Sequence, residues 1–494
     1  MANPKTLRRA ALVLGLAGMT ALGAEVIAAC GSTAQTNAPD TGAPVHIGVV
    51  IALSGDLKGT GVSLQNAALV AEQQLNAYGG ILGRPVVFDV KDDQTDQGTI
   101  LQGVVSDLLN QHVSAMLGPI GSTQVNVAQK LTYAAKTIEI TATATSPILS
   151  DAQPPTDRYL FRTVPNDTLQ AKALAIFAFS GPSLFADGGT AVVDSGSPAD
   201  AGDAGAPVIT GNGCHKMAIV YNNDDYGVPF EAALKQNFED PSRAGPGAVV
   251  VEQPIPTDKQ SSYAAQINAI QTANPDCLAM IVYDPAADEL LREIRAAQSS
   301  GGISPSLTIY GTDGSFTNDF IVNGQTQKGV ASSPSVAEGV YGTNPDPNPT
   351  QIDGYNDFSD LYLAQFALDP GATNLPGQVA NFYDAAILAA LAIEKAGTTS
   401  DPVAIQKALY LVAKGTNQTD TKVVGPGNIG DALNYIHQGT DINYEGASGS
   451  CDFDENGDVL GDYIIWQVTH NPASSPPMFT TIGKIRASKL APTQ

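Results

Sequence analysis

The segment "VHIGVVIALSG", Val45 to Gly55, is a continuous apolar run that ends in Ser-Gly. A strand covered by helices on both faces has this pattern, whereas a strand with one solvated face alternates apolar and polar residues. The residues that follow place Leu64, Ala67 and Leu75 on one helical face, and Gly79 with its neighbouring glycine ends the helix. A buried strand followed by such a helix is the repeating unit of a parallel sheet.

The same alternation of strand and helix continues along most of the chain. Further strands are predicted at "RPVVFDVKDD", "VSAMLGPIGS" and "TIEITATATS", and a second series follows Pro165 at "HKMAIVYNNDDYG", "AVVVEQPIP", "CLAMIVYDP" and "LTIYGTDG". The length of 494 residues also favours more than one core, because single cores stop growing at roughly 250 to 300 residues. The sequence therefore predicts an α/β protein with two doubly wound parallel-sheet lobes.

The expected division of the chain follows this rhythm. We assign the first lobe to residues 45–164 and 339–450, and the second lobe to residues 165–338 and 451–487. A long buried helix is predicted at 378–396, and short strands around "CDFDENGDVLGDYIIWQV" are expected to close the chain. Residues 186–213 are rich in Ala, Asp and Gly, so they bury little apolar surface and form a low-complexity insertion in the second lobe.

Residues 1–29 have the features of an export signal. Lys5, Arg8 and Arg9 precede an apolar run that is too short to span a bilayer as a stable helix. The run ends in "VIAAC", which resembles a bacterial lipobox and predicts that Cys30 becomes the lipidated first residue of the mature protein. Residues 30–44 would then be a flexible tether of a periplasmic or cell-surface lipoprotein. An ordinary signal peptide followed by a chance cysteine is the alternative.

Net charge and cysteine content restrict the partners and the covalent links. The formal net charge is −24, from 49 acidic and 25 basic residues, so a nucleic-acid backbone would be repelled. In an oxidising compartment, Cys214, Cys277 and Cys451 are expected to give one disulfide and one buried thiol. Cys214 and Cys277 each precede a strand of the second lobe, and the doubly wound order makes these strands neighbours. Cys214–Cys277 is therefore the preferred disulfide, with Cys214–Cys451 as the alternative.

Two motifs match known sites but lack the context that those sites need. "GPGNIG", Gly425 to Gly430, fits the dinucleotide fingerprint, yet no βαβ unit with an acidic residue follows it, so a turn is expected. "DFDENGDVLGDY" begins like a calcium loop, but Tyr463 stands where a bidentate Glu is required, so a tight hairpin turn at "ENGD" is expected. The histidines lack metal spacing, and no strand leads into a nucleophile elbow. We therefore expect no metal, no cofactor and no enzymatic activity.

Ligands of open parallel sheets bind beyond the carboxyl ends of the strands. In the first lobe, these ends carry hydroxyls and helix-start amides at Ser54, in "GPIGST" and in "TATATSP", and such groups suit a carboxylate. In the second lobe they carry Tyr226, Tyr283 and Asp313, which suit a cation beside an apolar body. A zwitterion would fit between the two sets. The alternative for the threonines is that they satisfy local backbone groups in a turn.

Taken in order, these segments resemble a known family. The succession of "ALSGDLKGTGVSLQNAALVAEQQLNAYGG", "GPIGST", "ITATATSP", "NDDYG", "YGTDG" and "YEGASGSCDFDENGD" is similar to the branched-chain amino acid binding proteins of ABC importers, which are type I periplasmic binding proteins. The resemblance covers nearly all of Val45 to Val468 except 186–213. It implies that two lobes close around an amino acid on a hinge of three crossing strands, and that a membrane permease recognises the closed form. We also expect a monomer.

The resemblance implies a role for several side chains. Ser122 corresponds to the residue that binds the α-carboxylate, Thr143 and Thr145 to the segment that binds carboxylate and amine, and Asp313 to the partner of the ammonium. Tyr226 and Tyr283 correspond to aromatic contacts, and Ser54 and Ile120 are further candidates at the strand ends.

The chain departs from the family pattern around the ligand side chain. Thr60 stands where a Tyr commonly lines the pocket, Asp313 is shorter than the Glu of the leucine binders, and Gln378 stands about where an aromatic residue is expected. The sequence therefore predicts that the groups binding the α-carboxylate and the α-ammonium are retained and that the side-chain pocket is altered. Leucine is therefore not implied as the ligand.

We expect a solute-binding protein that delivers an amino acid to an ABC importer. The alternatives are a binding protein or sensor for an amide, urea-like or carboxylate solute, and a secreted enzyme on the same scaffold. The enzyme would need an activated nucleophile or a metal cluster facing the cleft.

Overall fold

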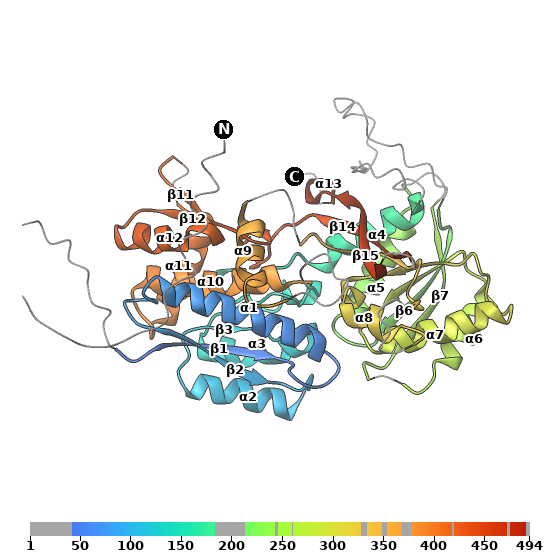
Figure 1. The fold of residues 1–494 in the computed structure, drawn as a ribbon, viewed down its shortest axis with the longest axis horizontal. Helices are drawn as coiled ribbons and strands as arrows, with labels where there is room; N and C mark the ends of the chain where they lie inside the picture. Colours follow the sequence, from blue (N-terminus) through green and yellow to red (C-terminus); the bar gives the residue numbers. More distant parts are fainter. Residues whose placement is uncertain are drawn as a thin grey trace, which may run out of the picture. The chain divides into compact units, whose positions relative to one another are not determined.

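The computed structural model describes residues 42–182, 213–242, 246–258, 260–327, 333–347, 353–367, 375, 377–416, 419–471 and 475–490. The predicted signal peptide, Cys30, most of the predicted tether and nearly all of the predicted 186–213 insertion lie outside these residues. Two large sheets organise the described chain (Figure 1).

The first lobe is built on a five-stranded parallel sheet with the order β2-β1-β3-β4-β5. Its strands are β1 (Val45–Ile51), β2 (Val86–Asp92), β3 (Met116–Leu117), β4 (Glu139–Thr141) and β5 (Leu160–Arg162). The apolar residues of β1 lie on both faces of the sheet, since Val49 packs in one core and Val50 in another. The continuous hydrophobic pattern of this segment is thus explained by helices on both sides.

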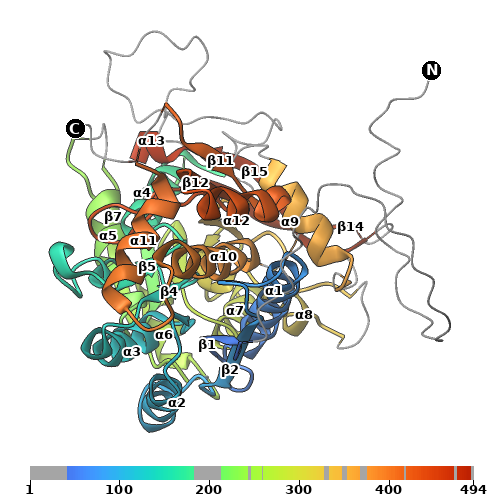
Figure 2. The same cartoon turned by 90° about the vertical axis from the view of Figure 1, so that its left-hand side faces the viewer.

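Helices cover the two faces of this sheet. α1 (Lys58–Ala77) and α10 (Val379–Ala396) share the large core with Val49, whereas α2 (Thr99–Asn110) and α3 (Ser122–Ala135) enclose the smaller core around Val50. In Figure 2, α1 and α10 lie on one side of β1 and β2, and α2 lies on the other. The buried helix predicted at 378–396 is confirmed, because the residues of α10 up to Glu394 are buried.

The carboxyl-terminal part of the first lobe packs around α10. It comprises α9 (Asp353–Leu363), α11 (Pro402–Lys414), α12 (Ile429–His437), and a small sheet of β11 (Lys422–Val424), β12 (Ile442–Gly446) and β13 (Gly449–Ser450). "GPGNIG" forms a short 3-10 turn, Pro426–Asn428, that leads into α12. The motif therefore serves as a turn within the packing of this lobe.

The second lobe contains a seven-stranded sheet with the order β15-β14-β10-β9-β8-β6-β7. Its parallel strands are β6 (Lys216–Asn222), β7 (Ala248–Ile255), β8 (Cys277–Ile281), β9 (Thr308–Gly311) and β10 (Tyr341–Pro345). Helices α4 (Asp167–Ser180) and α5 (Gly227–Phe238) pack on one face, and α6 (Ala264–Ala273) and α7 (Ala286–Ser299) on the other. The short α8 (Asn318–Asn323) and α13 (Ala487–Leu490) complete this lobe. A second α/β lobe with a parallel sheet core is therefore present.

Three details differ from the sequence-based expectation. β10 pairs with β9 and β14, so residues 341–345 belong to the second sheet, although residues 339–450 were expected in the first lobe. The closing strands are long, because β14 (Tyr463–Asn471) and β15 (Ser475–Ile485) form an antiparallel pair. The "ENGD" segment is a turn, in which Asp454 accepts the amides of Asn456 and Asp458, and no described strand pair flanks it as a hairpin would require.

The cysteines follow the preferred pairing. Cys214, just before β6, is joined by a disulfide to Cys277, the first residue of β8. β6 and β8 are neighbours in the sheet, which is the adjacency that the doubly wound order predicts. Cys451 is a buried free thiol in the core of the first lobe, so the alternative pair Cys214–Cys451 is not formed.

Candidate functional site

Strand ends of both lobes line one pocket. Its wall includes every residue that the sequence named as a candidate for ligand binding except Ser54, namely Thr60, Ile120, Ser122, Thr143, Thr145, Tyr226, Tyr283, Asp313 and Gln378. The Ser54 hydroxyl instead donates to Asp92 Oδ2 at 2.7 Å, and Asp92 Oδ1 also accepts the amides of Leu53 and Ser54. Ser54 therefore stabilises the end of β1 and does not line the pocket.

The threonine-rich loop after β4 is held by its own hydroxyls. Thr141 Oγ1 donates to the Pro119 carbonyl at 2.9 Å, and Thr143 Oγ1 donates to the Ile120 carbonyl at 2.6 Å. Thr145 Oγ1 donates to Asp167 Oδ2 at 2.9 Å. Local turn bonds of the kind in the alternative are made by Thr141 Oγ1, which accepts the amides of Thr143 and Ala144. The hydroxyl protons themselves go to groups outside this turn, and these bonds tie together the loops that form the pocket wall.

Ser122 lies at the first position of α3. Its Oγ accepts the amide of Ser146 at 3.3 Å, so its hydroxyl proton can be donated to a ligand. The first described intrahelical bond of α3 comes from Val125, whose amide donates to the Gly121 carbonyl. The amides before Val125 therefore have no intrahelical acceptor, and such helix-start amides are suited to an anion.

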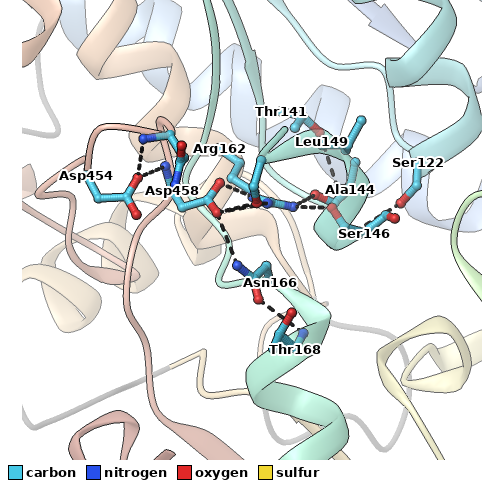
Figure 3. Close-up of polar contacts among 12 residues, drawn as sticks. Ser122, Thr141, Ala144, Ser146, Leu149, Arg162, Asn166, Thr168, Asp454 and Asp458 are labelled. Carbon is cyan, nitrogen blue, oxygen red and sulfur yellow. Dashed lines mark hydrogen bonds and ion pairs between the residues drawn. The ribbon is translucent and has the colours of Figure 1, made fainter. Parts of the chain in front are cut away.

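A buried ion pair supports this wall from behind (Figure 3). Arg162 Nη1 donates to the carbonyls of Ala144 at 3.3 Å and Ser146 at 2.8 Å, while its Nε donates to Asp458 Oδ1 at 2.6 Å. The Arg162 side chain is only 2% exposed. Burial alone would raise the pKa of Asp458, but the Arg162 guanidinium and the hydrogen bonds from Ser150 and Asn166 hold the pKa of this carboxyl below its usual range.

The same ion pair joins the segments that connect the lobes. The chain crosses between the sheets after β5, after β10 and after β13. Arg162 is the last residue of β5, and Asp458 lies between β13 and β14, so the pair links the first and third crossings. Asn166 Nδ2 donates to Asp458 Oδ2, and its own Oδ1 accepts the Thr168 amide at the start of α4. The threonine loop, both crossings and α4 therefore form one network.

On the second-lobe side, Asp313 follows β9 at the start of a short 3-10 turn, Asp313–Ser315. The Tyr226 hydroxyl donates to Asp313 Oδ1 at 2.8 Å, and the Tyr226 ring stacks on Tyr283 with 4.8 Å between ring centroids. Burial raises the pKa of Asp313 to about 6. Burial and, next, the charge of Asp313 raise the pKa of the neighbouring Asp167 well above its usual range.

The two lobes touch beside the pocket. Asn126 Nδ2 of α3 donates to Asp225 Oδ2 at 2.8 Å, and the Asp225 amide donates to Thr123 Oγ1 at 3.2 Å. Asp225 lies in the loop between β6 and α5 of the second lobe. The start of α3 thus contacts both the pocket and the opposite lobe.

Four polar residues of the pocket wall were not singled out from the sequence: Asp56, Asp284, Thr317 and Asp319. Asp284 is the acidic residue of "YDP", which was recognised only as a strand end. Thr317 accepts the Phe320 amide at the start of α8, and its hydroxyl also donates to Asp284 Oδ2. Asp284 follows β8 and is acidic, so the rule that ligands bind beyond strand ends could have identified it from the sequence.

The described part of the chain contains no group of three or more His, Cys, Asp or Glu side chains arranged to hold a metal ion. A search of the same residues also finds no helix with the length and apolar character needed to cross a membrane. The pocket wall carries hydroxyls, carboxylates and aromatic rings.

Comparisons with known proteins agree with this architecture. The family model described as a periplasmic binding protein matches residues 44–431. The chain is 24% identical over 431 residues to the chemotactic signal transduction system substrate-binding protein BasB of Halobacterium salinarum, which covers 87% of this chain and 88% of that protein.

Solved structures show the same fold. The leucine binding protein LivK of Thermotoga maritima superposes with a TM-score of 0.65 at 18% identity, over 90% of this chain and 99% of that one. A solute binding protein of an ABC transporter from Rhodopseudomonas palustris BisB5, in complex with 3,4-dihydroxybenzoic acid, superposes with a TM-score of 0.62 at 17% identity, over 90% and 98%. Because the family model covers most of the chain and the two-lobed fold is shared, this protein belongs to the periplasmic binding protein family.

Proposed function

We propose that this extracytoplasmic solute-binding protein captures an α-amino acid between its lobes and delivers it to an ABC importer. The observation that carries the proposal is the opposite chemistry of the two pocket walls. Ser122 and the start of α3 present donors on one wall, while Asp313, Tyr226 and Tyr283 present a carboxylate and aromatic faces on the other. A zwitterion satisfies both walls at once.

The first-lobe wall would hold the ligand carboxylate. The Ser122 hydroxyl can donate to it, and the first amides of α3 add further donors together with the positive end of the helix dipole. The hydrogen bonds of Thr143 and Thr145 keep the neighbouring loop in place, so these donors need little rearrangement when the ligand arrives.

The second-lobe wall would hold the ammonium. With a pKa of about 6, Asp313 is ionised at neutral pH, and the Tyr226 hydroxyl fixes its orientation. The stacked rings of Tyr226 and Tyr283 offer an aromatic surface beside it, which favours a cation with an apolar body.

The alternative ligands fit this wall less well. A benzoate-like anion, as in the Rhodopseudomonas complex, would leave Asp313 without a cation and would face Asp56, Asp284 and Asp319 as well. A neutral amide or urea would also leave Asp313 without a counter-ion. A sensing role, which the name of BasB suggests for that relative, would use the same capture step but would not require an importer.

Thermal unfolding with a ligand panel tests the proposal. The panel contains the L-amino acids, several D-amino acids, benzoate and its hydroxylated derivatives, acetamide and urea. A ligand present at about 100 times its dissociation constant stabilises the folded protein by about 2.7 kcal/mol. We expect at least one L-amino acid, and neither a benzoate nor an amide, to raise the unfolding temperature. A response to benzoates without any response to amino acids would contradict the proposal.

A further inference from the structure

Four carboxylates line the pocket. Asp313 is assigned above to the α-ammonium, and Asp56, Asp284 and Asp319 lie along the remaining wall. Among the described residues of this wall there is no Lys, Arg or His. Carboxylates that share a desolvated site repel one another, so a bound ligand gains from each positive charge that it places there.

Asp284 provides an independent observation, because one of its oxygens is buried without a partner. Asp284 is only 9% exposed, and its Oδ2 accepts the hydroxyl proton of Thr317. Its Oδ1 is buried without a hydrogen-bond partner among the described residues, and the backbone amide of Phe320 also reaches this carboxyl and lowers its pKa. A buried polar atom left in this way costs free energy, which an N–H donor of a ligand would recover.

The electrostatics of Asp284 favour a cationic donor over a neutral one. Burial and, next, the nearby Asp288 raise the pKa of Asp284 well above its usual range. Asp288 is itself buried, on the first turn of α7. A cation placed against Asp284 would lower the repulsion between the two carboxyls, whereas a neutral donor would leave it unchanged.

Asp284 and the residues assigned to the α-carbon groups do not share the same surroundings. Asp56, Gly59, Asp284 and Asp319 line both the pocket and a wider hollow next to it, where Lys58 is the basic residue of the described wall. Asp284 therefore lies toward the end that opens into this hollow, whereas Ser122 and Asp313 line the pocket alone. A side chain that leaves an α-carbon held by Ser122 and Asp313 would run along this acidic wall.

We propose that the ligand is an α-amino acid with a basic side chain, such as lysine, ornithine or arginine, whose side-chain cation binds at Asp284. Asp319 and Asp56 add negative potential along the path. This inference rests on the proposed function, because it takes the α-carboxylate and the α-ammonium as bound by Ser122 and Asp313. The absence of a metal-holding group among the described residues agrees with an organic cation.

Isothermal titration calorimetry on the full chain tests the inference with three ligands that share a four-carbon side-chain stem. They are L-lysine, L-norleucine, which has no side-chain amine, and Nε-acetyl-L-lysine, in which the amine is neutral. Loss of one partner of a buried charge pair weakens binding by about 30-fold or more. We therefore expect L-lysine to bind at least that much more tightly than either neutral analogue.

Two substitutions locate the cation. Asp284→Asn keeps the size of the side chain and should remove most of the preference for lysine over norleucine, and Asp319→Asn should reduce it less, because Asp319 is exposed. The matched control is Asp107→Asn, which also removes one negative charge but lies on α2, paired with Lys91 away from the pocket. It should keep the preference. Unfolding temperatures check that each variant is folded, and Asp319→Asn still tests the acidic wall if Asp284→Asn does not fold.

The outcomes separate this inference from the proposed function. Tighter binding of norleucine or leucine than of lysine overturns the inference and leaves the amino-acid function intact. A lysine preference that survives in both Asp284→Asn and Asp319→Asn places the cation elsewhere and also overturns it. Binding of no α-amino acid at all overturns the proposed function, and the inference with it.

Discussion

Asp313 lies beside the hydroxyl of Tyr226 in the pocket wall, and in the proposed function its carboxylate pairs with the α-ammonium. Removing it would leave a buried ammonium without a counter-ion, whereas Ser122 supplies one of several donors to the carboxylate. We expect Asp313→Ala to weaken an amino-acid ligand by about 3 to 5 kcal/mol and Ser122→Ala by about 1.5 to 3 kcal/mol. Calorimetry of both variants gives the order, and parent-like affinity in Asp313→Ala would refute the assignment.

The pH dependence of binding reports on the same residue. Because burial raises the pKa of Asp313 to about 6, its carboxylate gains a proton as the pH falls through that value, and the ammonium loses its partner. Affinity for an amino acid with a neutral side chain should therefore be nearly constant above about pH 7 and decrease toward tenfold per pH unit below about pH 5. A neutral side chain brings no cation to Asp284, so Asp284 does not affect the pH dependence of this affinity. An affinity that is unchanged down to about pH 5 would show that Asp313 does not hold the ammonium.

At the scale of elements, the ion pair between Arg162 and Asp458 joins two of the segments that connect the lobes. Removing one charge leaves the other buried without a partner, so Asp458→Asn should destabilise the protein by about 3 to 5 kcal/mol. Asp107→Asn breaks the exposed ion pair with Lys91 and should cost at most about 1 kcal/mol. Denaturation followed by the fluorescence of Trp466, the single tryptophan, compares the two variants.

The pH dependence of stability gives a further test of this ion pair. The pKa of Asp458 is below its usual range in the folded protein, so its contribution is present above the unfolded pKa of about 3.9 and decreases as the pH falls further. The difference in stability between the parent and Asp458→Asn should therefore shrink in acid. Equal stability of the two proteins at neutral pH would show that the ion pair does not hold the crossings.

The same elements show what sequence patterns can predict. β1, β6 and β8 were predictable because their apolar runs are continuous, and α10 because it is long and apolar throughout. The place of β10 was not, since its partner β14 follows more than a hundred residues later and periodicity says nothing about pairing over such distances. The partnership of Arg162 and Asp458, 296 residues apart, was hidden for the same reason.

At the scale of the whole molecule, the strand-end rule brought most of the candidate site together from residues far apart in the chain. Thr143, Tyr226 and Asp313 come from three different parts of the chain and line one pocket. The rule identifies positions, but it does not give the burial or the charge balance at each one. The pKa of Asp284 is raised by its burial and by Asp288, and both effects depend on packing that the sequence does not display.

The predicted attachment to the membrane is the last property at this scale, and the lipobox interpretation makes it depend on Cys30. No helix of the described chain could cross a bilayer, and a formal net charge of −24 disfavours adsorption to anionic lipids. Lipid chains on Cys30 would then supply the attachment, since more than one chain gives stable anchoring. We expect Cys30→Ala to move the exported protein from the membrane to the soluble fraction. Cys451→Ala, which changes a buried thiol of the first-lobe core, is the matched control and should stay with the membrane. If Cys30→Ala also fractionates with membranes, the lipobox interpretation is wrong and another segment must hold the protein there.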